Sequence, residues 1–92
     1  MPDQPMELRL LKSRIRSFQP LRLVPYDSVP ISVARFDEAV IFLIRHWPVA
    51  FALSPLRLQA LAACRGAMEG EGDPVAAREV LVKAADEAGL LP

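Results

Sequence analysis

The chain has 92 residues, 52% of them hydrophobic, and its 11 basic and 11 acidic side chains cancel to a formal net charge of zero. This length corresponds to one small domain, and the apolar content is too high for a disordered chain. No apolar run reaches the length of a transmembrane helix, no signal-peptide pattern follows the N-terminal charges, and Cys64 is the only cysteine. We therefore expect a cytoplasmic protein with no internal disulfide and no membrane contact.

The charges are unevenly distributed along the chain. Residues 1–24 carry five basic and two acidic side chains, whereas residues 66–92 carry six acidic and two basic ones. A basic arm suits an acidic partner such as nucleic acid, but five cations are few for phosphate binding. Solvation of both ends, or attraction between them, explains the pattern more simply.

The N-terminal residues 1–17 have no consistent periodicity. Their apolar residues alternate over one stretch, as in a strand, and also recur at helical spacing. We therefore divide the chain into an N-terminal arm, residues 1–17, that is a candidate for disorder, and a single α+β domain, residues 18–92.

Residues 20–34 predict a β-hairpin. The runs "PLRLV" and "PISVA" favour strands, and "PYDSV" between them supplies turn chemistry through Pro25 and Asp27. Pro30 cannot donate to a strand ladder, so the second strand is expected at an edge. Because two strands alone are marginally stable, the hairpin needs cover from a helix, a third strand or a partner chain.

Three helices are predicted after the hairpin. The first covers residues 35–47, with a buried stripe of Phe36, Ala39, Val40, Leu43 and Trp47. The second begins at the N-cap Ser54 and ends at Gly70, with a buried stripe of Leu58, Leu61, Ala62, Arg65 and Met68. The third begins at the N-cap Asp73 and ends at Gly89, with a buried stripe of Ala77, Val80, Leu81, Ala84 and Ala88. The short "GEGD" connection makes the last two helices an antiparallel helical hairpin.

The segments "FLIRHWP" and "LQALAACRGAMEGEGDPVAAREVLVKAADEAGLL" resemble the domain-of-unknown-function family 982, a group of small bacterial proteins. The resemblance covers roughly residues 20–92 and implies a short hairpin followed by helices. The family has no established activity, so it supplies no functional residues. Two features depart from its pattern: the link "VAFAL" is more apolar than usual, and Ile41 stands where a polar residue is typical.

Few residues suggest chemistry. His46 and Trp47 lie beside each other at a helix end, and Cys64 lies mid-helix among alanines, so these three are weak candidates for a ligand site. A structural histidine and a buried, inert cysteine explain them better. We predict no catalytic residues, no metal ligands and no cofactor, because one histidine and one cysteine on different helices provide neither a ligand set nor an oriented nucleophile–base pair.

The link between the first two helices is the most unusual stretch. Five apolar residues in a row, Val49 to Leu53, stand where loops are normally polar. Either the link covers the core, with Phe51 buried, or Ile41, Val49, Phe51 and Leu53 form an exposed interface for a partner or a second copy.

Taken together, these patterns predict an α+β fold, a short hairpin against about three helices, that acts as a non-catalytic protein-interaction or regulatory module. The alternative is a small ligand-binding protein, or a nucleic-acid-binding protein that uses the basic arm. The expected partner is another protein or, weakly, a second copy of the chain. The neutral isoelectric point and the mixed charges on the helices argue against nucleic acid.

Overall fold

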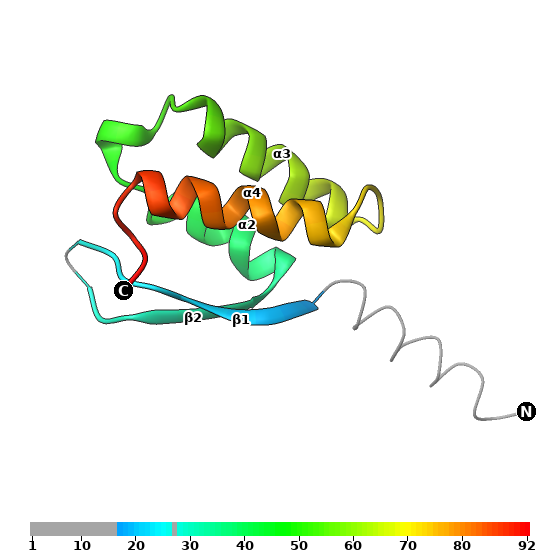
Figure 1. Cartoon of the computed structure of the whole chain (residues 1–92), viewed down its shortest axis with the longest axis horizontal. Helices are drawn as coiled ribbons and strands as arrows, with labels where there is room; N and C mark the ends of the chain where they lie inside the picture. Colours follow the sequence, from blue (N-terminus) through cyan, green and yellow to red (C-terminus); the bar gives the residue numbers. More distant parts are fainter. Residues whose placement is uncertain (1–16, 27) are drawn as a thin grey trace, which may run out of the picture.

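The computed structural model describes residues 17–26 and 28–92. The hairpin consists of β1 (Ser17–Leu23) and β2 (Ile31–Arg35), and it is followed by the helices α2 (Phe36–Arg45), α3 (Pro55–Met68) and α4 (Pro74–Glu87). A short 3₁₀ turn, η1 (Val49–Phe51), lies between α2 and α3. The predicted α+β fold, a hairpin followed by three helices, is confirmed (Figure 1).

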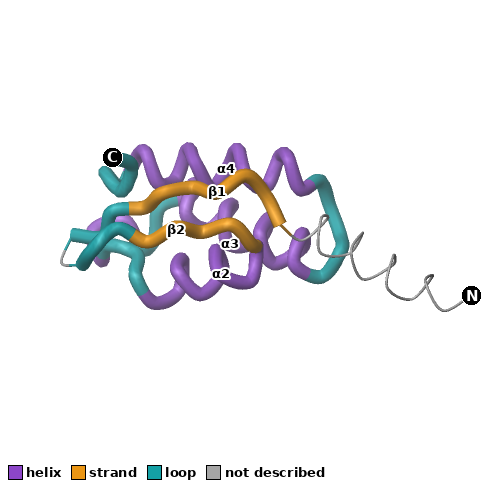
Figure 2. Tube along the Cα trace, turned by 90° about the horizontal axis from the view of Figure 1, so that it is seen from below, coloured by secondary structure: helices purple, strands orange, loops and turns teal. Residues whose placement is uncertain are grey.

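The hairpin forms one layer, and two helices cover one of its faces. Helix α2 packs on β2 and α4 packs on β1, while α3 packs against both helices on the side away from the strands (Figures 1 and 2). The antiparallel register pairs Leu21 with Val33, and it shifts between Ser17 and Leu21. Helices therefore provide the cover that an isolated hairpin needs.

The C-terminal residues tie α4 to the hairpin. The backbone N–H of Val24 donates to the carbonyl of Leu90 (2.7 Å), whose side chain is fully buried. The hydroxyl of Tyr26 donates to the carbonyl of Ala88 at 2.6 Å. These two hydrogen bonds fix the turn of the hairpin against the end of α4, which matters below because Tyr26 lines a groove.

The predicted boundaries of α3 and α4 are confirmed, and those of α2 need correction. Asp73 accepts a hydrogen bond from the backbone of Val75 (3.0 Å), as an N-cap should, and Gly89 has a positive φ of 72°. Helix α2 ends at Arg45 rather than at residue 47, because a proline disfavours helical geometry in the residue before it and Pro48 follows directly.

At the start of α3, Ser54 occupies the predicted N-cap position, but its side chain does not cap the helix. Its hydroxyl instead donates to the carboxylate of Glu87 on α4. The side chain therefore joins the beginning of α3 to the end of α4, which the sequence does not reveal because it depends on how two distant segments meet.

The buried stripe predicted for α3 is wrong. Its fully buried residues are the small side chains Ala60, Cys64 and Ala67, which lie on a different face of the helix. Small residues allow α3 to approach the alanine-rich face of α4 closely, and the predicted stripe is turned partly toward solvent. Of the predicted stripe, Leu61 and Met68 are partly buried, whereas Leu58, Ala62 and Arg65 are exposed.

Candidate functional site

The apolar link between α2 and α3 has two sides. Phe51 is partly buried and packs against the core, whereas the side chains of Val49 and Leu53 are 91% and 86% exposed. The 3₁₀ turn causes this division: the N–H of Phe51 donates to the carbonyl of Pro48 at 3.0 Å, and the chain turns tightly enough that neighbouring side chains point in different directions. The link thus anchors itself by one aromatic ring and presents two aliphatic side chains to solvent.

Arg57 holds this link in place. Its guanidinium donates to the carbonyl of Leu43 near the end of α2 (2.8 Å) and to the carbonyl of Ala52 in the link (3.0 Å). Because a guanidinium is planar and charged, two such bonds fix the directions of both backbone segments. Val49 and Leu53 are consequently presented by a fixed backbone.

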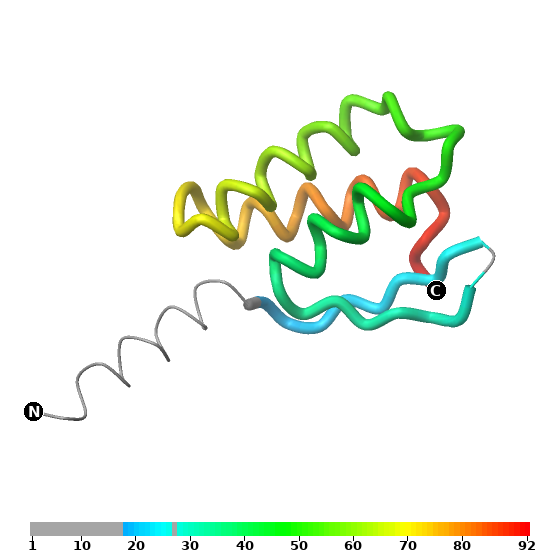
Figure 3. Tube along the Cα trace, turned by 180° about the vertical axis from the view of Figure 1, so that it is seen from behind, coloured from blue at the N-terminus to red at the C-terminus, as the bar shows by residue number. Residues whose placement is uncertain are grey.

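Further exposed apolar side chains lie on the two helices that the link connects. Ile41 and Ile44 are 53% and 54% exposed on the outer side of α2, and Leu58 is 48% exposed on α3. A hydrogen bond joins the guanidinium of Arg57 on α3 to the carbonyl of Leu43 on α2. Ile44 follows Leu43 in the chain and Leu58 follows Arg57, so Ile44 and Leu58 lie at the same height along the two packed helices. Figure 3 shows α2 and α3 side by side, with α4 behind them.

We call the exposed parts of Ile41, Ile44, Val49, Leu53 and Leu58 the α2–α3 surface. Of the eight large hydrophobic side chains that are exposed in the described part of the chain, these are five. The other three lie on other elements: Tyr26 and Val29 in the hairpin turn, and Val75 on α4. Exposed apolar area is therefore concentrated on one half of the molecule.

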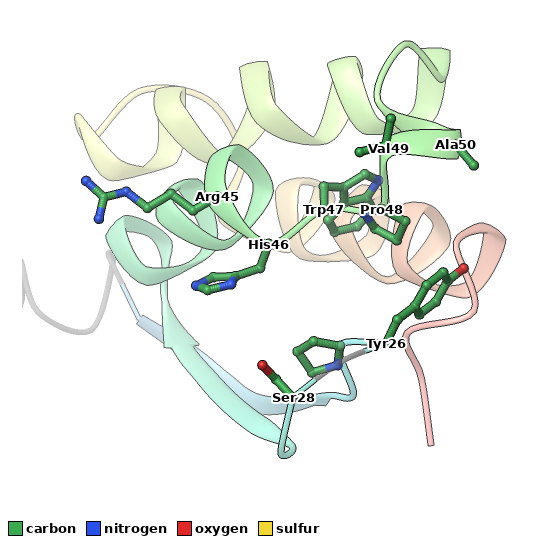
Figure 4. A pocket seen from close by; sticks show the side chains of 9 residues that line it. Tyr26, Ser28, Arg45, His46, Trp47, Pro48, Val49 and Ala50 are labelled. Atoms are coloured by element: carbon green, nitrogen blue, oxygen red, sulfur yellow. The ribbon is translucent and has the colours of Figure 1, made fainter.

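A groove of about 450 Å³ lies between the hairpin turn and the end of α2. Tyr26 and Ser28 form one side, and His46, Trp47 and Pro48 form the other (Figure 4). Arg45 and Val49 also line the groove, and the side chain of Arg45 points away from Trp47 (Figure 4). The groove is open to solvent along one side, so it can receive a protruding segment more readily than it can enclose a small molecule.

The aromatic residues of the groove are held by the core. The ring of Phe42, which is buried, lies 5.5 Å from the ring of His46 and 6.0 Å from that of Trp47, the latter edge-on. The Trp47 Nε1 atom is buried and has no hydrogen-bond partner among the described residues, so the indole offers the groove only apolar ring atoms. The Tyr26 hydroxyl is already bound to α4.

The structure brings two of the three weak ligand candidates together. His46 and Trp47 line the groove, whereas Cys64 is fully buried in the core between helices and is not among the residues that line it. Burial raises the pKa of the Cys64 thiol to about 12 through desolvation of the thiolate. A thiol in this state is a packing group and a poor nucleophile.

The described residues, 17–26 and 28–92, lack two further features. No group of three or more His, Cys, Asp or Glu side chains converges there in a way that could hold a metal ion. None of the helices in this part of the chain combines the length and the apolar character needed to cross a membrane.

A comparison with protein families shows to which family this chain is similar. The model of a family described as a protein of unknown function (DUF982) matches residues 19–92, which includes the hairpin, all three helices and the apolar link. The chain belongs to this family. No curated protein and no solved structure matches the chain of this DUF982 member. The site must therefore be interpreted from its own geometry.

Sequence reasoning about this DUF982 chain identified part of the α2–α3 surface. It named Ile41, Val49 and Leu53, which are exposed, and Phe51, which is partly buried. It missed Ile44 and Leu58, and it missed the role of Arg57. One sequence signal does point to this region: residues 39–68 contain three arginines and one histidine but no aspartate or glutamate.

Proposed function

We propose that this protein is a non-catalytic interaction module that binds a protein partner through the α2–α3 surface. The observation that carries the proposal is the exposure of Val49 and Leu53 on a link that Arg57 fixes in one conformation. Leaving such side chains in water forfeits about 1.5–3 kcal/mol each compared with burial. A fixed backbone also reduces the entropy lost when a partner binds.

The rotation of α3 gives independent support. The leucine stripe that resembles a buried face in the sequence is turned partly outward, and the buried contact with α4 is made by small residues instead. A helix that uses alanine and cysteine for its internal contact keeps its larger apolar side chain Leu58 available for an external one. An apolar, partly polar-rimmed surface of this kind is typical of protein contacts.

A selection experiment tests the proposal. A displayed library of random 16-residue peptides is selected against the full-length protein, and the affinities of the enriched peptides are then measured against two double variants. The first is Val49→Asp with Leu53→Asp. The matched control is Val29→Asp with Val75→Asp, in which two other valines, 77% and 66% exposed, receive the same charge.

If the α2–α3 surface binds partners, the first double variant lowers the affinity of the enriched peptides by about 100-fold or more, since roughly 3–6 kcal/mol of apolar contact is lost. The control variant binds them as the wild type does. A selection that yields no binder, or binders that are equally sensitive to both double variants, would show that this surface is not an interaction site.

A further inference from the structure

Within residues 39–68, which contain the α2–α3 surface, arginine is the only charged residue type among aspartate, glutamate, lysine and arginine. Arg45 follows Ile41 by four residues on α2, and Arg65 follows Leu58 by seven residues on α3, so each arginine shares a helix face with an exposed apolar side chain. Both arginines are exposed. The only salt bridge among the described residues joins Arg35 to Asp37, so neither arginine is neutralised there.

The carboxylates closest to this region along the chain have partners within the molecule or lie at its margin. Asp37 is paired with Arg35 at 2.9 Å, and Glu38 accepts the backbone N–H groups of Ala34 and Arg35 at the start of α2.

At the two ends of α3 the carboxylates are exposed and keep their negative charge. Glu87 accepts a hydrogen bond from Ser54 at the beginning of the helix. Glu69 is the first carboxylate after the acid-free stretch, residues 39–68, and marks the far edge of the surface. The α2–α3 surface is thus apolar and is flanked by Arg45 and Arg65, which we call the cationic rim, with carboxylates at its two ends.

This charge pattern disfavours a second copy in a two-fold contact. Such a contact brings together two copies of the same arginine-bearing patch, so the acid-free stretches of both copies carry charge of the same sign. Like charges that are brought together on association oppose binding, whereas opposite charges accelerate it and select the partner. A partner that matches this surface combines apolar side chains with carboxylates.

We infer that the partner of the α2–α3 surface is an acidic amphipathic helix. Its apolar stripe packs on Ile41, Ile44 and Leu58, and carboxylates beside the stripe pair with Arg45 and Arg65. A helix is the matching element, because an amphipathic helix lays its apolar stripe along an apolar surface of two packed helices, with its anchor residues at helical spacing. This inference rests on the proposed function, since it names the chemistry of the partner that binds the same surface.

The test uses the peptides enriched in the selection above and compares them with the unselected library. The inference predicts an excess of aspartate and glutamate beside a helical apolar stripe. The tightest peptide is synthesised with a fluorescent label, together with a control in which every acidic residue is replaced by its amide. Binding to the full-length protein is measured by fluorescence anisotropy at low and high salt.

We expect the acidic peptide to bind about tenfold or more tightly than its amide control at low salt, and the difference to shrink at about 0.5 M salt because screening weakens exposed charge pairs. The double variant Arg45→Glu with Arg65→Glu should weaken the acidic peptide about tenfold or more and leave the amide control unchanged or tighter. The matched control is Arg22→Glu, an exposed arginine on β1 outside this surface, and it should change neither affinity.

Three results would overturn the inference. Enriched peptides that are neutral or basic would show that charge does not select the partner. Equal binding of the acidic and amide peptides would show the same. Sedimentation of the free protein as a dimer that the peptide does not dissociate would identify a second copy as the occupant. In each case the proposed function still stands if the double variant Val49→Asp with Leu53→Asp loses peptide binding or no longer dimerises. Failure of this inference is therefore distinguishable from failure of the proposed function.

Discussion

The role of Arg57 leads to a prediction about stability. Replacing it with methionine keeps most of the apolar stem but removes the hydrogen bonds to the carbonyls of Leu43 and Ala52. Hydrogen bonds to charged groups contribute about 1.5–3 kcal/mol each, and a partly buried carbonyl left without a donor adds a cost. Allowing for relaxation of the link toward water, we expect Arg57→Met to lower the free energy of unfolding by about 2–4 kcal/mol.

Urea and thermal unfolding of the full-length protein measure this change. In a domain of this size the loss corresponds to a fall in Tm of roughly 10–20 °C. Arg57→Lys should lie between wild type and Arg57→Met, because one ammonium group does not reproduce the geometry of a planar guanidinium bound to two carbonyls. Arg65→Met is the control: the side chain of this exposed arginine on the same helix makes no hydrogen bond within the described residues.

The reasoning would be refuted if Arg57→Met and Arg65→Met changed the unfolding free energy equally. It would also be refuted if Arg57→Met lowered stability by less than about 0.5 kcal/mol, the usual range for surface substitutions. Either result would mean that the link keeps its conformation without the two hydrogen bonds, and that its fixed presentation of Val49 and Leu53 has another origin.

Three further predictions concern the rest of the fold. The Cys64 thiol, with a pKa of about 12, is ionised in only about one molecule in 10,000 at pH 8, so maleimide labelling of the native protein should be far slower than in denaturant, and fast native labelling would contradict its burial. Tyr26→Phe removes the hydrogen bond to Ala88 and should cost about 1 kcal/mol in urea unfolding, whereas an unchanged midpoint would show that this bond does not hold the turn. Removal of residues 1–16 should leave cooperative unfolding within about 0.5 kcal/mol of wild type, because the family match spans residues 19–92, and a loss of cooperativity would show that the arm is part of the fold.

The sequence predicted those parts of the fold that depend on local chemistry. Asp73, Pro74 and Gly89 determine the ends of α4 through capping, a fixed φ and a left-handed conformation, and these effects involve only neighbouring residues. The hairpin was predicted for the same reason, although β1 begins at Ser17 and not at residue 20. The predicted arm, residues 1–17, lies outside the described residues except for Ser17.

Features that depend on contacts between distant segments were not predicted. The rotation of α3 follows from the close approach of Ala60 and Cys64 to α4, and a one-helix pattern cannot show which of two apolar faces finds a partner. Ser54 satisfies the local rule for an N-cap, but Glu87 competes successfully for its hydroxyl. The bonds of Arg57 likewise require the relative placement of two helices and a link.

The α2–α3 surface was predicted only in part, because it depends both on local sequence and on contacts between distant segments. The apolar link was recognised because five apolar residues in a loop break a local rule, but the division between Phe51 and its neighbours depends on the 3₁₀ turn. Leu58 was assigned to the core because its spacing fits a buried stripe. An acid-free stretch of the sequence, residues 39–68, could have indicated the cationic rim before the structure was known.

Mapping the binding site by NMR tests the central claim most directly. Backbone amide shifts of the full-length protein are followed while the tightest selected peptide is added. The account predicts that the largest changes occur at Ile41, Ile44, Val49, Leu53 and Leu58, with few changes in β1 and the outer face of α4. Changes concentrated instead at Tyr26, Ser28 and the outer face of the hairpin would place the binding site elsewhere and contradict the account.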